Sequence, residues 1–238
     1  KLSAIENNPQ KTTRKQTAAI RHSLKTATSA ESVELFGCMT YSSKWSTSEN
    51  GEFGIYSFPA EEGTAFTPVK TAADFNLSAA AYADGKFCGY RVTTYGSTVY
   101  GVNYYLFDTD GWTRDIQQTL KASYDNYPIS LAYDSKTKTI YGQFMSEAGA
   151  TRLCTVDLLS GQPTQVASTG DRMYFTLSFD KEGTLYGIAD DGNLYTINTA
   201  TGTATSIGAT GIIPSNSQSA TIDLNTGKMY WAAINNKL

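Results

Sequence analysis

Residues 179–208 read FDKEGTLYGIADDGNLYTINTATGTATSIG, and this stretch decides the fold. Three short strand patterns follow one another in it: TLYGIAD, NLYTINT and TATSIG. The segments DDGN and ATG separate them, and Asp and Gly tolerate the positive φ of tight hairpin turns. The stretch therefore predicts a small antiparallel sheet whose strands are consecutive in the chain.

The same unit recurs along the sequence. Its first strand reads LSAAAYAD, PISLAYDS, YFTLSFDK and SATIDLNT, and each copy ends near an acidic residue. These residues, Asp84, Asp134, Asp180 and Asp223, are 50, 46 and 43 positions apart. That spacing matches one four-stranded blade of a β-propeller. Small residues dominate the first strands, which suits the crowded axis where inner strands converge.

Both ends of the array of repeats are incomplete. LFGCMTYS, FGIYSFPA and AFTPVKT match second, third and fourth strands with no first strand before them, whereas SATIDLN and KMYWAAI supply only a first and a second. We therefore predict an all-β propeller of four-stranded antiparallel blades over residues 32–238, an incomplete or small ring with about four to five blades in this chain. Residues 1–31 are basic and poor in apolar side chains, which predicts a polar tail or linker.

Composition agrees with this fold and narrows the classes of function. The chain has 16 Tyr and 10 Phe, but only 17% charged residues and a net charge of −3, which argues against nucleic acid as a partner. It contains no apolar run long enough to span a membrane. Cys38, Cys88 and Cys154 lie in separate strand patterns. We expect three buried, unreactive thiols, with one disulfide and one free thiol as the alternative.

Residues 191–208, DGNLYTINTATGTATSIG, resemble the repeat of secreted bacterial propellers. Residues 153–166, LCTVDLLSGQPTQV, follow the same sequence pattern. The chain is similar to the NHL and quinoprotein-like propeller superfamily, and most like uncharacterised propeller proteins of gut Bacteroidetes. The resemblance covers roughly residues 33–238. It implies an extracellular or cell-surface location, with a lipid-anchored outer-membrane or a periplasmic protein as variants. Its motifs are structural, so it transfers no catalytic residue.

The residues do not indicate a catalytic or metal site. His22 is the only histidine, and it lies in the predicted tail. Asp108-Thr109-Asp110-Gly111 resembles half a calcium loop, but we interpret it as a hairpin turn, as we do Asp190-Asp191-Gly192-Asn193. The recurring aspartates offer a carboxylate pair for glycoside hydrolysis. Their equivalent positions favour a structural role in the first hairpin turn instead. We therefore predict no catalytic residue, no metal and no cofactor.

The functional prediction rests on the lengths of the loops that connect the strands. Strands alternate in direction, so second-to-third-strand and blade-to-blade connections share one face of the ring, and these are the long and varied ones: 42–52, 93–103, 122–128, 146–151, 168–172 and 209–217. Variable loops on a rigid scaffold are where function usually concentrates. Aromatic, arginine and acidic side chains on them are the predicted binding residues: Trp45, Tyr95, Tyr124, Asp125, Tyr127, Arg172 and Tyr174.

Three functions are compatible with this sequence. The favoured one is a non-enzymatic extracellular binding or adhesion module whose long-loop face binds a glycan or a protein surface. The alternatives are a propeller enzyme acting on glycans, as a hydrolase or lyase, and a structural docking domain of a larger secreted protein. A pair of acidic residues with raised pKa values in the central channel favours the enzyme. An aromatic loop face without such a pair favours binding.

Overall fold

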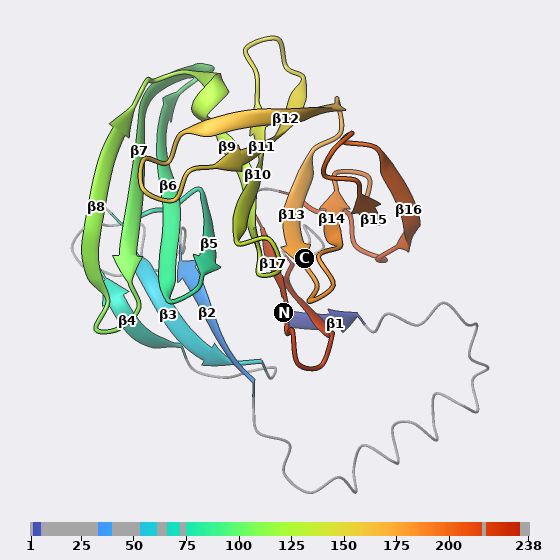
Figure 1. The fold of residues 1–238 in the computed structure, drawn as a ribbon, viewed down its shortest axis with the longest axis horizontal. Helices are drawn as coiled ribbons and strands as arrows, with labels where there is room; N and C mark the ends of the chain where they lie inside the picture. The colour runs from blue at the N-terminus through green and yellow to red at the C-terminus, as the bar shows by residue number, and fades with distance from the viewer. Residues whose placement is uncertain are drawn as a thin grey trace, which may run out of the picture.

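The computed structural model describes residues 2–5, 33–39, 53–60, 66–71, 75–215 and 218–233. Over these residues the regular structure consists of strands and one short 3₁₀ helix, arranged as antiparallel sheets around a central axis (Figure 1). This confirms the all-β propeller predicted from the repeat. Three of the sheets have four strands and two have three. No helix in the described ranges is long and apolar enough to cross a membrane.

The three four-stranded sheets are the complete blades, and each follows the chain from its inner strand outward. The first contains β5 (Ala79–Ala83), β6 (Lys86–Tyr95), β7 (Thr98–Asp108) and β8 (Thr113–Leu120). The second contains β9 (Pro128–Asp134), β10 (Thr139–Met145), β11 (Thr151–Val156) and β12 (Pro163–Gly170). The third contains β13 (Tyr174–Phe179), β14 (Leu185–Ala189), β15 (Asn193–Ile197) and β16 (Ala204–Ala209).

The two three-stranded sheets come from the incomplete ends of the array. One contains β2 (Glu34–Met39), β3 (Gly54–Pro59) and β4 (Thr67–Thr71), and the other contains β17 (Ser219–Ile222), β18 (Met229–Ala232) and β1 (Leu2–Ile5). Strand β1 pairs antiparallel with β18, from Leu2 opposite Ala232 to Ile5 opposite Met229. Four residues of the segment predicted as a tail therefore join the last sheet, and residues 6–32 lie outside the described ranges.

The inner strands hold the ring together through their hydroxyl groups. Strands β5, β9, β13 and β17 contact one another in that order around the axis. The Ser130 hydroxyl donates to the Tyr174 carbonyl at 2.7 Å, and the Ser178 hydroxyl accepts from the Ile222 amide at 2.9 Å. Each bond joins one blade to the next. The small polar residues predicted to fit the crowded axis thus also connect the sheets.

Aromatic side chains fill the space between blades. Tyr90 and Tyr104 of the first complete blade are fully buried and pack edge to face at 5.1 Å. Their hydroxyls donate to the carbonyls of Gly161 and Leu158, at 2.5 and 2.6 Å, in a turn of the next blade. Large rings therefore supply apolar area, and their polar tips are satisfied across the interface.

The cysteines are not paired with one another. Cys88 and Cys154 are fully buried, whereas Cys38 is half-buried on β2. Burial raises the pKa of each of the three thiols to about 11. Buried thiols were the prediction for all three, and they are found at Cys88 and Cys154. Because the thiolate is the reactive form, these two side chains are chemically protected.

Candidate binding face

The connections between strands gather on two opposite faces of the ring. We call the face with first-to-second and third-to-fourth connections the turn face, and the face with second-to-third and blade-to-blade connections the long-loop face. The turn face repeats a few hydrogen-bonded turns. The long-loop face differs from blade to blade. Because strand direction alternates in an antiparallel blade, connections of the same kind lie on the same face.

One turn recurs three times on the turn face. Asp157, Asn198 and Asp223 each accept, through the backbone carbonyl, the amide of a glycine four residues later. Each side-chain oxygen accepts amide hydrogen bonds as well, for example from Ser160 to Asp157 at 2.7 Å. The glycines all have positive φ, which a side chain would disfavour. The repeated pattern in the sequence, acid or Asn followed by Ser or Thr and then Gly, therefore encodes this turn.

The recurring aspartates of the first hairpins have turn roles, with one exception. Asp134 accepts from the Lys136 amide at 2.9 Å and the Thr137 hydroxyl at 2.7 Å, and Asp180 accepts from two amides. Asp84 instead has φ of 45° in a two-residue turn and pairs with Lys138 of the next blade at 2.5 Å. The pKa of Asp84 is lowered by the hydrogen bond from Lys138 and also by one from Tyr133.

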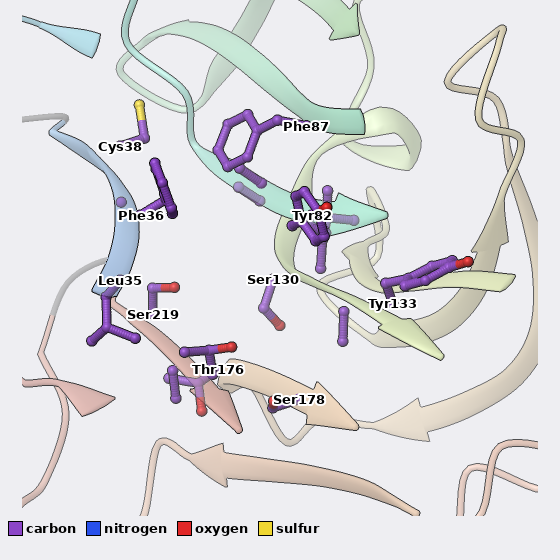
Figure 2. A pocket seen from close by; sticks show the side chains of 18 of the residues that line it. Leu35, Phe36, Cys38, Tyr82, Phe87, Ser130, Tyr133, Thr176, Ser178 and Ser219 are labelled. Carbon is purple, nitrogen blue, oxygen red and sulfur yellow. The ribbon is translucent and has the colours of Figure 1, made fainter. Parts of the chain in front are cut away.

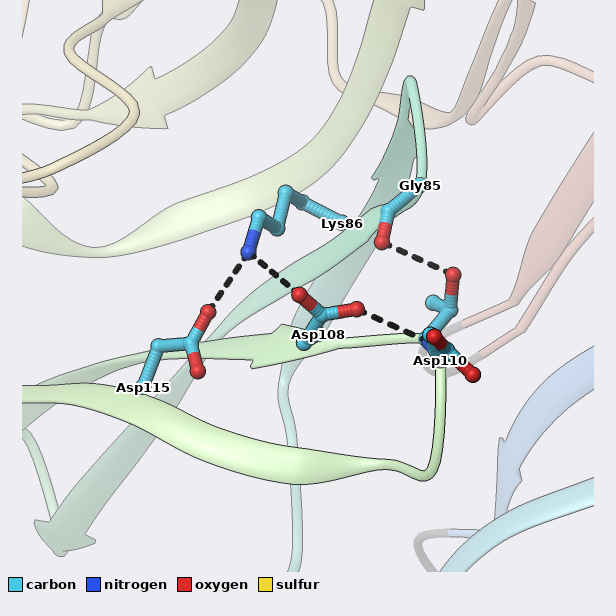
Figure 3. Close-up of polar contacts among 6 residues, drawn as sticks. Gly85, Lys86, Asp108, Asp110 and Asp115 are labelled. Carbon is cyan, nitrogen blue, oxygen red and sulfur yellow. Dashed lines mark hydrogen bonds and ion pairs between the residues drawn. The ribbon is translucent and has the colours of Figure 1, made fainter.

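The half calcium loop is a hairpin turn. Lys86 reaches Asp108 at 2.8 Å and Asp115 at 2.6 Å, and the hydrogen bond from Lys86 lowers the pKa of Asp108 (Figure 3). The other Asp108 oxygen accepts from the Asp110 amide at 2.8 Å. Lys86 therefore bridges the carboxylates of Asp108 and Asp115 on the two strands beside the turn. The described part of the chain contains no cluster of three potential metal ligands.

On the long-loop face, hydrogen bonds join the two kinds of connection in the first and third complete blades. The Tyr124 hydroxyl, between β8 and β9, donates to the Ser97 carbonyl at the β6–β7 hairpin, at 2.6 Å. The Thr210 amide, after β16, donates to the Gly192 carbonyl between β14 and β15 at 2.9 Å. The predicted loop 93–103 is mostly strand, because β6 and β7 extend to a turn at Gly96-Ser97. Its Thr, Val and Tyr residues favour a strand.

Two pairs of tyrosines, one at the β6–β7 hairpin and one in the β8–β9 connection, are linked by the hydrogen bond from Tyr124 to Ser97, and we call them together the tyrosine patch. Tyr95 and Tyr100 flank the hairpin, pack edge to face at 6.5 Å, and are 80% and 64% exposed. Tyr124 lies in the 3₁₀ helix η1 (Tyr124–Asn126) and stacks on Tyr127 at 6.1 Å. Because the Tyr124 hydroxyl holds the hairpin backbone, the exposed pair sits on an ordered support. Asp125 lies beside the patch, with Arg152 of β11 at 3.8 Å.

Arg172 belongs to a second group, at the third blade. Its guanidinium lies 4.4 Å from the centre of the Tyr195 ring and 4.0 Å from Asp191. The Tyr195 hydroxyl donates to Asp191 at 2.6 Å, and this hydrogen bond is the main cause of the raised pKa of Tyr195. Arg172 is therefore held by a ring and a carboxylate while half of its side chain stays accessible.

A buried amide anchors the segment that carries Arg172. Gln143 is fully buried; its side-chain nitrogen donates to the Arg172 carbonyl at 2.8 Å, and its oxygen accepts from the Tyr174 amide at 2.6 Å. Thr151 also donates to the Arg172 carbonyl at 2.9 Å. The connection between β12 and β13 is thus fixed to its neighbouring blade through its backbone.

The predicted binding residues do not form one site. Tyr124 stacks on Tyr127 and is hydrogen-bonded to the hairpin that carries Tyr95, and Asp125 is its neighbour in the chain, whereas Arg172 lies in the separate group. Tyr174 is 1% exposed and packs on Tyr195 at 6.0 Å, so its predicted contact role does not fit. Trp45 lies outside the described residues. Sequence reasoning missed Arg152, Asp191 and Tyr195 as partners, because no local pattern links them to Asp125 or Arg172.

The axis holds a cavity of about 970 Å³ that is lined by the inner strands (Figure 2). Its wall combines small and hydroxyl side chains, including Ser130, Thr176 and Ser178, with Phe36, Tyr82 and Phe87. Each of these three hydroxyls is hydrogen-bonded to backbone. Glu34 and Asp84 are the acidic groups of the described lining, and the pKa of Asp84 is lowered. The shift at Asp84 is opposite in sign to the raised pKa expected of a general acid.

No protein-family model and no curated protein matches the sequence. Several solved structures match the fold of the chain. TolB from Acinetobacter baumannii is 13% identical with a TM-score of 0.47, over 79% of this chain and 45% of that one. A putative 6-phosphogluconolactonase from Bacteroides uniformis is 14% identical with a TM-score of 0.42, over 86% of this chain and 62% of that one. PorZ from Porphyromonas gingivalis is 15% identical with a TM-score of 0.37, over 72% of this chain and 25% of that one. The chain spans less than two thirds of each of these structures, and the likeness concerns the fold alone.

Proposed function

We propose that this propeller is a non-enzymatic binding module and that the tyrosine patch of the long-loop face is its contact surface. The observation that carries the proposal is the pair Tyr95 and Tyr100, 80% and 64% exposed on a hairpin held by Tyr124. Exposed aromatic rings on a rigid support offer large contact area at low conformational cost, and their hydroxyls add hydrogen bonds. The partner is a glycan or a protein surface.

The carboxylates support binding over turnover. Asp84, Asp108 and Asp157 have lowered pKa values because they accept hydrogen bonds from lysine, from serine or from backbone amides. Burial tends to raise the pKa of Asp191, but hydrogen bonds from Tyr195 and Asn193 keep it below its usual range. A general acid at neutral pH needs the opposite shift. The resemblance to secreted bacterial propellers supports the proposal that this module acts outside the cell or on its surface.

A glycan array and a pull-down with bacterial surface proteins test the proposal, using the wild-type chain, Tyr95→Ala and Tyr100→Ala. We expect binding by the wild type, and a loss of about tenfold or more in each variant. Tyr82→Ala is the matched control, because Tyr82 is 59% exposed but lines the axial cavity. Equal binding by Tyr95→Ala and wild type, or hydrolysis of a bound glycan over many turnovers, would overturn the proposal.

A further inference from the structure

Two connections meet beside the third complete blade on the long-loop face. The Asp190 amide, between β14 and β15, donates to the Met173 carbonyl, between β12 and β13, at 2.9 Å. Gln143 and Thr151 donate to the carbonyl of the preceding residue, Arg172, at 2.8 and 2.9 Å. The backbone that carries Arg172 is therefore fixed on two sides, and little conformational entropy is lost when its side chain binds a ligand.

The side chains of Arg172 and Asp191 are both positioned by Tyr195. The Tyr195 ring lies 4.4 Å from the guanidinium, and its hydroxyl donates to one oxygen of Asp191 at 2.6 Å. The other Asp191 oxygen accepts from the Asn193 amide at 2.9 Å. One tyrosine thus sets the place of a hydrogen-bond donor group and of an acceptor group at the same time.

The ion pair leaves hydrogen-bonding capacity on both of its side chains. Nη2 of Arg172 and Oδ2 of Asp191 are 4.0 Å apart, which is too far for a direct hydrogen bond, and the two side chains are 41% and 39% accessible. A guanidinium has several N–H donors, and a carboxylate has about four acceptor positions. The Tyr174 hydroxyl uses one of these donors, and Tyr195 and Asn193 use two of the acceptor positions. Both groups can therefore bind a further partner.

Charge and spacing select the chemistry of that partner. Asp171 and Asp190 are exposed next to Arg172 and Asp191 in the chain, so negative charge exceeds positive charge here and disfavours an anion. A neutral ligand has to accept from the guanidinium and donate to the carboxylate. Two hydroxyls on adjacent carbons of a sugar ring do both. Their oxygens lie farther apart than the oxygen and nitrogen of one amide group, which suits side-chain atoms that are 4.0 Å apart.

We propose that Arg172 and Asp191 form a sugar subsite that binds two adjacent hydroxyls of a neutral glycan. Arg172 donates to one hydroxyl oxygen, and Asp191 accepts from the other hydroxyl. Tyr195 is a positioning residue, because its ring and its hydroxyl hold these two side chains. The subsite rests on the proposed binding function, and it names a glycan as the ligand, but it shares no residue with the tyrosine patch.

An NMR titration of the ¹⁵N-labelled full-length chain tests the subsite through the Arg172 Nε–H and Gly192 amide signals. The probes are the methyl α-glycosides of mannose, galactose and glucose, which together present cis and trans pairs of adjacent hydroxyls. The control ligands are acetamide and the 3-deoxy analogue of the best probe, in which no two hydroxyls are on adjacent carbons. We expect saturable shifts with a Kd on the order of millimolar, and binding at least about tenfold weaker for both controls.

Arg172→Lys keeps the charge but loses the planar fork of donors, and it should weaken the response of the Gly192 amide at least about tenfold. Lys181→Ala is the matched control, because Lys181 pairs with Glu182 at 3.8 Å on the turn face, and its response should equal that of the wild type. Equal responses to acetamide or the deoxy analogue, an undiminished response in Arg172→Lys, or no saturable shift with about 100 mM of each glycoside would overturn the subsite. These signals report the third blade alone, so the subsite and the tyrosine patch can fail separately.

Discussion

The turn face and the long-loop face are built from the same strands but use their residues differently. On the turn face, Asp157, Asn198 and Asp223 make the same turn with the same glycine four positions later. On the long-loop face, the first complete blade presents the exposed pair Tyr95 and Tyr100, and the third presents Arg172 held by Tyr195 and Asp191. Repetition therefore marks residues that the fold requires, and departure from the repeat marks residues available for recognition.

The largest effect should come from placing a side chain inside a repeated turn. Gly161 has φ of 69°, and a Cβ there would lie 2.2 Å from Tyr104 of the preceding blade. Gly161→Ala should lower the free energy of unfolding by about 3 kcal/mol, from clash and backbone strain together. Gly211→Ala on the long-loop face is the control, since its φ is 84° but nothing lies within 4 Å. Equal losses in urea denaturation would remove the distinction between the faces.

Gln143 should rank next, because it fixes the β12–β13 connection from within. Gln143→Leu leaves the buried Tyr174 amide and Arg172 carbonyl without this partner and should cost about 2 kcal/mol. Hydrogen exchange at the Tyr174 amide should speed up, which shows whether the connection itself has loosened. Gln165→Leu, at an exposed position of β12, serves as the control. Unchanged exchange at Tyr174 would mean that the network does not order Arg172.

A smaller loss of folding stability is expected for substitutions at the first hairpin of the third complete blade. Asp180 accepts from the Glu182 and Thr184 amides at 3.0 and 2.8 Å. Asp180→Ala should destabilise the fold by about 1 kcal/mol, whereas Asp180→Asn, which keeps an acceptor oxygen, should lose less than half of that. Thermal melts of both variants measure the difference. Identical losses would show that charge, rather than hydrogen bonding, makes aspartate suitable for this turn.

The smallest effect concerns pH. Hydrogen bonds from Ser160 lower the pKa of Asp157, so its ionised form stabilises the folded state above the unfolded-state pKa of about 4. That contribution is lost as the pH falls through the lower native pKa. Asp157→Asn should cost about 0.5 kcal/mol at pH 7 and flatten the decline of stability below about pH 4. Urea midpoints measured from pH 7 to pH 2 test this, and an unchanged slope would contradict it.

Much of the architecture can be predicted from the sequence because the spacing of the repeats equals the length of one blade. The spacing of Asp84, Asp134 and Asp180 located the blades, and the glycine turns at 161 and 202 set the hairpins between them. The pairing of β1 with β18 was not predictable, since Leu2–Ile5 matches no strand of the repeat unit. Backbone pairing between chain ends is a long-range event with no local signature.

The candidate site was only partly predictable for a related reason. Tyr95 and Tyr124 were recognised from their places in connections, but nothing local indicated that the Tyr124 hydroxyl would bind the Ser97 carbonyl. Tyr174 directly follows a connection, yet it begins β13 and is buried by packing on Tyr195. Position in the chain predicts which face a residue belongs to. Burial depends on neighbours from other strands, which a single sequence does not show.

The links from Tyr90 to Gly161 and from Ser130 to Tyr174 join each blade to the one that follows it. Each complete blade thus carries an attachment to its successor, the third through the Ser178 hydroxyl and the Ile222 amide. Duplication of one repeat in the gene would copy the blade and its means of attachment together. A ring built in this way can gain or lose whole blades in evolution without inventing a new interface.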